Sequence, residues 1–157
     1  MSKGFEIHCY DYVNHPYAQV RDALTKDPVT LFRAATRAAA SRAQSVAAEL
    51  RVELGGVGVE ADITISVENI EEKSSATRMQ LEWESATMPN LFPLMKAEIA
   101  IYPLTATETQ LDFQGTYEPP LGALGKAMNA LVGHRIAEAS VHRFVTDVAG
   151  YLRQAIV

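Results

Sequence analysis

Six stretches of this chain carry apolar residues on alternate positions, and this pattern constrains the fold more than any other feature. A period of two residues is typical of a β-strand with one dry face and one solvated face. The clearest case is residues 57–70, where valine, alanine and isoleucine alternate mostly with charged and polar residues. The pattern therefore predicts a sheet of six strands, over about 5–13, 46–54, 57–70, 76–86, 94–104 and 108–117.

Helical segments lie at both ends of this strand-rich region. Two short helices are expected after the first strand, the second starting at Asp27-Pro28 and ending at about Gln44, because aspartate is a good N-cap and proline fits the first helical turn. Later links are short, and Gly55-Gly56 suits a two-residue hairpin, so neighbouring strands should be antiparallel. Since the dry face needs a cover, we expect an α+β fold, an antiparallel curved sheet wrapped around a long C-terminal helix.

Length and composition are those of one globular domain. The chain has 157 residues, 48% of them hydrophobic and 21% charged, so we expect a single domain over 1–157. A net charge of -5 argues against nucleic acid as a partner. The N-terminus lacks the apolar region of a signal peptide, and no run of 18 apolar residues occurs. The expected location is the cytoplasm, with no membrane span.

The C-terminal helical segment is too long to lie straight on such a sheet. Residues 120–155 would span about 54 Å as one helix, against about 33 Å for a ten-residue strand. Val141, Phe144, Val145, Val148 and Leu152 share one helical face, whereas the apolar residues before position 133 share another. Because glycine is a poor helix former, we expect a break near Gly133, with 121–131 folding over the end of the sheet.

A sheet gripping one helix can leave a cavity between the helix, the dry face and the loops at one end. Such a space suits an apolar ligand held by few polar groups. The alternative is a packed core in which Trp83 and the methionines fill that volume. The residues predicted to line the cavity are Ile63, Ile65, Met79, Leu81, Trp83, Leu91, Phe92, Ile99, Ile101, Phe113, Tyr117, Leu124 and Met128.

Two segments carry a resemblance to a known superfamily. Residues 12–28, beginning YVNHP, look like a strand entering paired helices, and residues 115–122 (GTYEPPLG) with 134–139 (HRIAEA) look like a last strand and helix. In these segments, and in the order of its elements, the chain resembles the START-like or SRPBCC superfamily, which has the helix-grip fold and includes pollen allergens, lipid-transfer domains and polyketide cyclases. The family usually has seven strands, whereas six are predicted here. The resemblance implies binding of a hydrophobic, lipid- or polyketide-like molecule.

No motif for catalysis stands out, and no catalytic residue, metal site or cofactor is expected. The chain lacks a nucleophile elbow, a phosphate-cradling glycine loop and a dinucleotide fingerprint. An enzyme of the polyketide cyclase or dehydratase type would need two polar side chains converging in the cavity, with Asp11, Tyr117 or Asn69 the first to test. His134 and His142 are expected at the surface or its boundary, and Asp11 is expected to bond local backbone.

A third hypothesis concerns the apolar loops at 88–93 and 119–124. Exposed apolar loops often mark a contact with another protein. Under this hypothesis the loops bind a protein partner, and a homodimer is left open. The leading hypothesis remains a module that binds a small hydrophobic molecule and is not an enzyme.

Overall fold

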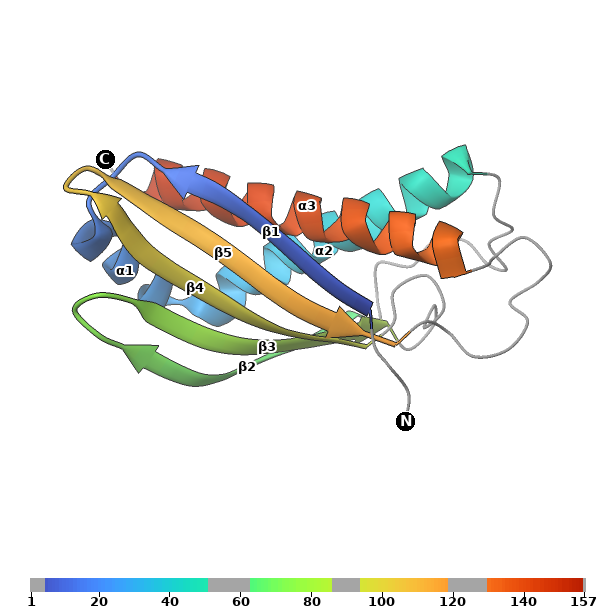
Figure 1. Cartoon of the computed structure of the whole chain (residues 1–157), viewed down its shortest axis with the longest axis horizontal. Helices are drawn as coiled ribbons and strands as arrows, with labels where there is room; N and C mark the ends of the chain where they lie inside the picture. The colour runs from blue at the N-terminus through green and yellow to red at the C-terminus, as the bar shows by residue number, and fades with distance from the viewer. Residues whose placement is uncertain (1–4, 51–62, 86–93, 119–129, 157) are drawn as a thin grey trace.

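The fold is an antiparallel sheet with helices packed on one face (Figure 1). A computed structural model describes residues 5–50, 63–85, 94–118 and 130–156. In chain order its elements are β1 (Phe5–Val13), α1 (Tyr17–Lys26), α2 (Pro28–Glu49), β2 (Ile63–Glu72), β3 (Thr77–Ser85), β4 (Met95–Thr105), β5 (Glu108–Tyr117) and α3 (Ala130–Ala155).

The strands β2 to β5 form a meander, as the short connections predicted. The sheet order is β1-β5-β4-β3-β2, and every neighbouring pair is antiparallel. The first strand pairs with the last, so that Phe5 lies opposite Tyr117. Met95, on β4, lies opposite Tyr117 on one side and opposite Trp83 of β3 on the other. Residues of β1, β5, β4 and β3 therefore lie side by side at the end of the sheet where β5 finishes. We call this end of the sheet the open end.

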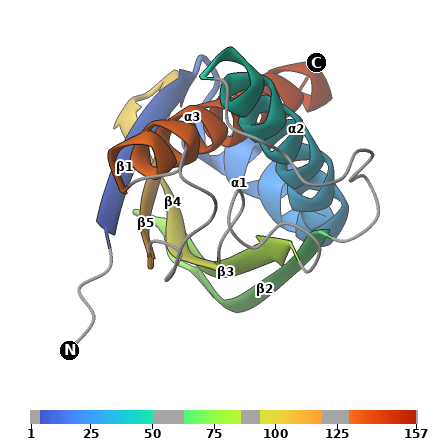
Figure 2. The ribbon, with the colours of Figure 1, turned by 90° about the vertical axis from the view of Figure 1, so that its right-hand side faces the viewer.

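The helices cover the dry face of the sheet. Seen end on, α2 and α3 lie across from the curved sheet (Figure 2), and α3 packs along α2 and beside β1. Asp27 caps α2 by accepting a hydrogen bond from the backbone N–H of Thr30 at 3.3 Å, with Pro28 in the first turn as predicted. The predicted helical stripe is buried: Val141, Phe144, Val145, Val148 and Leu152.

The strand predicted at 46–54 is wrong for the part that the structure describes. Residues 46–49 belong to α2, which has 22 residues and is not short. Ala39, Ala43, Val46 and Ala47 are buried together, so the helical stripe simply continues. Alanine and glutamate are good helix formers, and their alternation imitated a strand over a few residues. The described residues thus form five strands, not six or seven; residues 51–62, including Gly55-Gly56, lie outside them.

The break expected near Gly133 is also absent from the described helix. α3 runs from Ala130 to Ala155 without interruption and would be about 39 Å long, close to the length of the strands that it covers. The helix therefore needs no break at Gly133 to match the sheet. Residues 121–131 were expected to fold over the open end. Of these, 121–129 lie outside the described residues, and 130–131 belong to α3.

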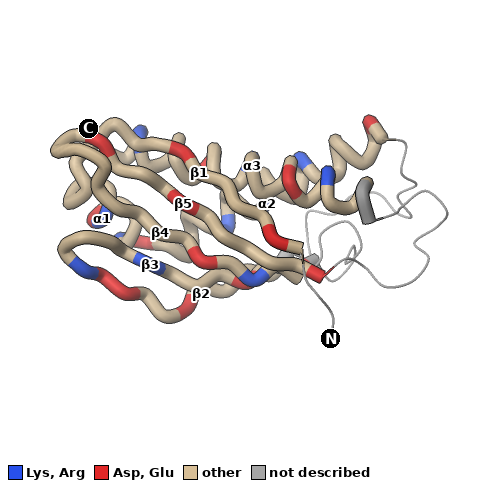
Figure 3. Tube along the Cα trace, viewed as in Figure 1, with Lys and Arg blue, Asp and Glu red and all other residues tan. Residues whose placement is uncertain are grey.

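The opposite face of the sheet is solvated. Charged residues of both signs are scattered along the strands (Figure 3), and Glu82 lies opposite Lys96 on the neighbouring strand. A shallow depression of about 310 Å³ crosses this face, between residues including Glu68, Gln80 and Glu98. It has the character of a solvated surface. No helix in the described ranges is long and apolar enough to span a membrane.

Candidate functional site

Six of the predicted lining residues come together on the dry face. Each is at most 2% exposed, and they come from β3, β4 and β5: Met79, Leu81, Trp83, Ile99, Ile101 and Phe113. Ile65 on β2 is half-buried beside them. The prediction that these residues share one buried face is therefore confirmed. Their part in binding a ligand stays a prediction.

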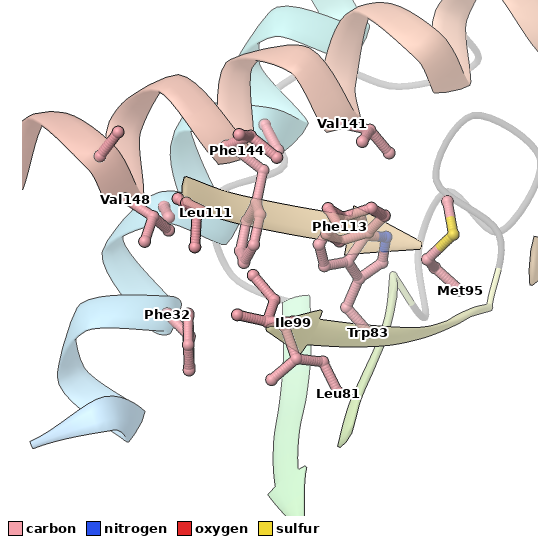
Figure 4. Close-up of a cluster of buried hydrophobic side chains, with 14 of the residues drawn as sticks. Phe32, Leu81, Trp83, Met95, Ile99, Leu111, Phe113, Val141, Phe144 and Val148 are labelled. Atoms are coloured by element: carbon pink, nitrogen blue, oxygen red, sulfur yellow. The ribbon is translucent and has the colours of Figure 1, made fainter. Parts of the chain in front are cut away.

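Aromatic rings fill the centre of this face (Figure 4). The ring of Phe144, from α3, lies 4.8 Å from Trp83, 5.7 Å from Phe113 and 5.9 Å from Phe32, measured between centroids. Trp83 and Phe113 stack at 5.7 Å. We call these four residues, which connect α2 and α3 to the sheet, the aromatic cluster. Such contacts at 4.5–7 Å stabilise a core, and they favour the packed alternative for the centre of the dry face.

The open end of the same face has a different chemistry. Tyr117, the last residue of β5, is 2% exposed, and its hydroxyl lies 2.7 Å from Nδ1 of His134 on α3. The two rings are nearly parallel, 16° apart, with centroids at 6.0 Å. We call Tyr117 and His134 the polar pair. Two hydrogen-bonding side chains thus converge on the inner side of a largely apolar face.

The surroundings of the polar pair are apolar on one side and acidic on the other. The ring of Phe5 lies 5.6 Å from that of Tyr117 and 5.3 Å from that of His134. One turn along α3, Oε1 of Glu138 lies 3.5 Å from Nε2 of His134. Burial, with a smaller effect of the Glu138 charge, raises the pKa of Tyr117 to about 12. Tyr117 is therefore a neutral phenol at physiological pH.

A glycine separates the polar pair from the aromatic cluster. Gly115 lies between Phe113 and Tyr117 on β5, and a Cβ at this position would lie 2.8 Å from Cε1 of Phe113 and 2.9 Å from Sδ of Met95. Both contacts are closer than side chains normally allow. The absence of a side chain at Gly115 therefore allows the side chains of Phe113 and Met95 to pack close to the β5 backbone. Gly115 lies between the aromatic cluster and the polar pair.

The other polar candidates do not reach the polar pair. Asp11 accepts a hydrogen bond from the backbone N–H of Tyr12 at 2.7 Å, as predicted, and pairs with Arg153 near the C-terminal end of α3 at 3.2 Å. Asn69 is exposed at an irregularity of β2, has a φ of 52°, and donates to Gln80 at 2.6 Å. Of the three candidates for an enzyme, only Tyr117 meets a second polar side chain inside the fold.

The prediction that His134 and His142 lie at the surface or its boundary is confirmed, since His134 is partly exposed and His142 is exposed. The contact of His134 with Tyr117 was not predicted. A signal for His134 was present in the sequence. It precedes Val141 by seven residues and Val148 by fourteen, so it falls on the stripe that faces the sheet. The prediction compared the two histidines with each other and not with this stripe.

Several predicted site residues lie outside the described ones. They are Leu91, Phe92, Leu124 and Met128, together with the whole of the loops at 88–93 and 119–124. The backbone of Ile63 belongs to β2, and we describe nothing of its side chain. In the described ranges no group of three or more histidine, cysteine, aspartate or glutamate residues could hold a metal ion.

Comparison with known proteins places the fold. No family model matches the sequence, and no curated protein matches it. The crystal structure of Ara h 8.0201 is similar over 97% of this chain and 99% of its own, with a TM-score of 0.51 and 8% identity. A conserved protein from Geobacillus kaustophilus (TM-score 0.49, 15% identity, 96% of each chain) and the Zhui aromatase/cyclase from a Streptomyces species (TM-score 0.47, 14% identity, 99% of this chain and 97% of that one) were also found. The likeness to Ara h 8.0201 over the whole length confirms the helix-grip fold.

Proposed function

We propose that this protein binds a small hydrophobic molecule, of lipid- or polyketide-like character, between the sheet and α3 at the open end. The observation that supports this proposal most strongly is the polar pair, in which Tyr117 and His134 meet at 2.7 Å beside Phe5. A ligand site typically combines a large apolar surface with a few placed polar groups. The apolar surface provides affinity, and the polar pair sets the orientation of the ligand.

The open end is a better place for the ligand than the centre of the dry face. The aromatic cluster occupies the centre, and Phe113, Phe144 and Trp83 would have to separate before a molecule could enter. Interiors packed in this way are costly to open. We therefore assign Trp83 and Phe113 to the floor of the site. Leu91, Phe92, Leu124 and Met128, which lie outside the described residues, stay proposed ligand contacts on the sequence prediction alone.

Native mass spectrometry tests the proposal directly. The freshly purified chain, a single domain over 1–157 that we expect in the cytoplasm, should carry extra mass that is lost on denaturation. If it is purified empty, added 2-naphthol should bind as a single molecule. The Tyr117→Phe variant should keep its fold and retain less of either molecule. A wild-type chain that carries no ligand and takes up no naphthol or comparable apolar probe contradicts the proposal.

A second candidate function is acid–base catalysis at the same place. The enzyme hypothesis required two polar side chains converging inside the fold, and the polar pair meets that requirement, with Glu138 behind it. A neutral phenol beside an imidazole can pass a proton to or from a bound molecule. The two functions differ in what leaves the protein. A binding protein releases a co-purified molecule unchanged after incubation, whereas an enzyme releases a product, and Tyr117→Phe should stop its formation.

A further inference from the structure

Three side chains at the open end form a chain of polar contacts with a defined order. Oε1 of Glu138 lies 3.5 Å from Nε2 of His134, and Nδ1 of the same imidazole lies 2.7 Å from the hydroxyl of Tyr117. The carboxylate of Glu138 is mostly exposed, His134 is partly exposed, and Tyr117 is buried. The chain therefore runs from the solvent inward and ends at the phenol.

The charge of Glu138 decides which nitrogen of a neutral His134 carries the proton. A neutral imidazole has one N–H donor and one acceptor nitrogen. A proton on Nε2 faces the carboxylate of Glu138 and is attracted to it. A proton on Nδ1 would leave the Nε2 lone pair facing that negative charge. The first tautomer is favoured, so Nδ1 of His134 accepts a hydrogen bond.

The tautomer of His134 fixes the direction of the next hydrogen bond. Since Nδ1 accepts, the hydroxyl of Tyr117 must donate its single proton to His134. The phenol oxygen then presents lone pairs, and no proton, to a ligand. A neutral tyrosine can recognise a carbonyl as a donor or a hydroxyl as an acceptor, and here the donor role is already used.

We propose that the open end selects ligands that offer a hydrogen-bond donor, a hydroxyl or an N–H group on an apolar body, over ligands that offer only a carbonyl. This inference rests on the proposed function, since it concerns the ligand of that same site. A carbonyl oxygen placed against Tyr117 would meet lone pairs with lone pairs. The apolar surroundings make such a mismatch more costly than in water. A carboxylate is disfavoured further by the nearby charge of Glu138.

Three probes with the same bicyclic body test this selection. 2-Naphthol offers a donor, 2-naphthaldehyde offers only an acceptor, and naphthalene offers neither. Their dissociation constants should be measured with the whole chain by competition against a fluorescent apolar dye. We expect naphthol to bind about tenfold more tightly than the aldehyde, and the aldehyde no more tightly than naphthalene.

Two variants test the residues that carry the inference. Tyr117→Phe should reduce the naphthol preference to about onefold. Glu138→Lys places a cation beside Nε2 of His134, which favours the proton on Nδ1 and frees the Tyr117 hydroxyl to donate, so the aldehyde should bind as well as naphthol or better. Glu138 is an exposed helical residue, and its variant should therefore fold even if Tyr117→Phe does not. Asp147→Lys, on the same helix, is the control for charge reversal and should leave the preference unchanged.

The outcomes separate this inference from the function on which it rests. If the probes bind but the aldehyde equals naphthol, or if Glu138→Lys leaves the naphthol preference intact, the inference is overturned and ligand binding stands. If no probe binds to the folded wild-type chain, the proposed function fails, and the inference fails with it.

Discussion

Phe113 and Tyr117 lie four residues apart on β5 and face the same side of the sheet, yet the side chains around them differ in chemistry. Phe113 lies in the aromatic cluster, where rings from α2, α3, β3 and β5 fill the interior. Tyr117 lies in the polar pair, where one hydroxyl meets one imidazole. A closely packed core leaves no room for a ligand, whereas hydrogen-bonding groups beside apolar side chains are typical of a ligand site. We therefore expect the aromatic cluster to contribute mainly to stability, and we propose that the polar pair contributes to ligand recognition.

The largest effect should come from opening the aromatic cluster. Phe144→Ala removes a fully buried ring that contacts three others, and should lower the free energy of unfolding by about 3–5 kcal/mol. Urea unfolding followed by circular dichroism measures this loss. Tyr151→Ala on the same helix removes a ring that is 47% exposed, and should change stability by less than about 1 kcal/mol. Equal losses in the two variants would contradict the assignment of stability to the cluster.

The buried hydroxyl of Tyr117 in the polar pair should make the free energy of unfolding depend on pH. The pKa of Tyr117 is raised from about 10 in the unfolded chain to about 12 in the folded protein, so the folded state favours the neutral phenol. This contribution is fully present below about pH 10 and is lost as pH rises toward 12. The stability difference between wild type and Tyr117→Phe should therefore shrink by about 2 kcal/mol between about pH 9 and pH 11.5. A difference that stays constant across that range would show that the hydroxyl is not buried as described.

Gly115 marks the boundary, and filling it should disturb both regions. Gly115→Ala forces a Cβ against Phe113 and Met95, and should destabilise the protein by about 1–3 kcal/mol. Gly150→Ala is the matched control, because a Cβ at that position in α3 meets nothing within 4 Å. The control should stabilise the protein by up to about 1 kcal/mol, since alanine is the better helix former. Thermal unfolding should thus move in opposite directions, and a stabilising Gly115→Ala would contradict the close approach.

The smallest effect is expected at Asp11, at the other end of the sheet. Its carboxylate pairs with Arg153, which also donates to the backbone oxygen of Tyr12. Partly exposed ion pairs contribute about 0–1 kcal/mol, so Asp11→Asn should change the free energy of unfolding by no more than that. It should also leave the affinity for 2-naphthol unchanged. A large loss of affinity would move the site away from the polar pair.

The strands with a long period-two pattern could be read from the sequence to within a few residues. β3, β4 and β5 were predicted at 76–86, 94–104 and 108–117 and are found at Thr77–Ser85, Met95–Thr105 and Glu108–Tyr117. Residues 46–49 failed because alanine, valine and glutamate fit a helical stripe and a strand equally well over so short a stretch. Tertiary packing of α2 against α3 decided between the two.

The sequence predicted which residues of the candidate site are buried, but not which of its polar side chains meet. Burial of Trp83 and Phe113 follows from local alternation, which a sequence displays directly. The meeting of Tyr117 with His134 depends on how the last strand and the last helix face each other, and no local pattern encodes that angle. Pairing of β1 with β5, which brings Phe5 to the same place, is likewise a long-range contact. Individual residues could be proposed, but their convergence required the fold.

The central claim is that an apolar ligand lies against the polar pair and not in the aromatic cluster or on the solvated face. Intermolecular nuclear Overhauser effects between 2-naphthol and the isotopically labelled chain test it most directly. The account predicts contacts from the naphthol ring to the rings of Tyr117, His134 and Phe5. Contacts confined to the exposed rings of Tyr10 and Tyr12 on the solvated side of β1 would contradict it.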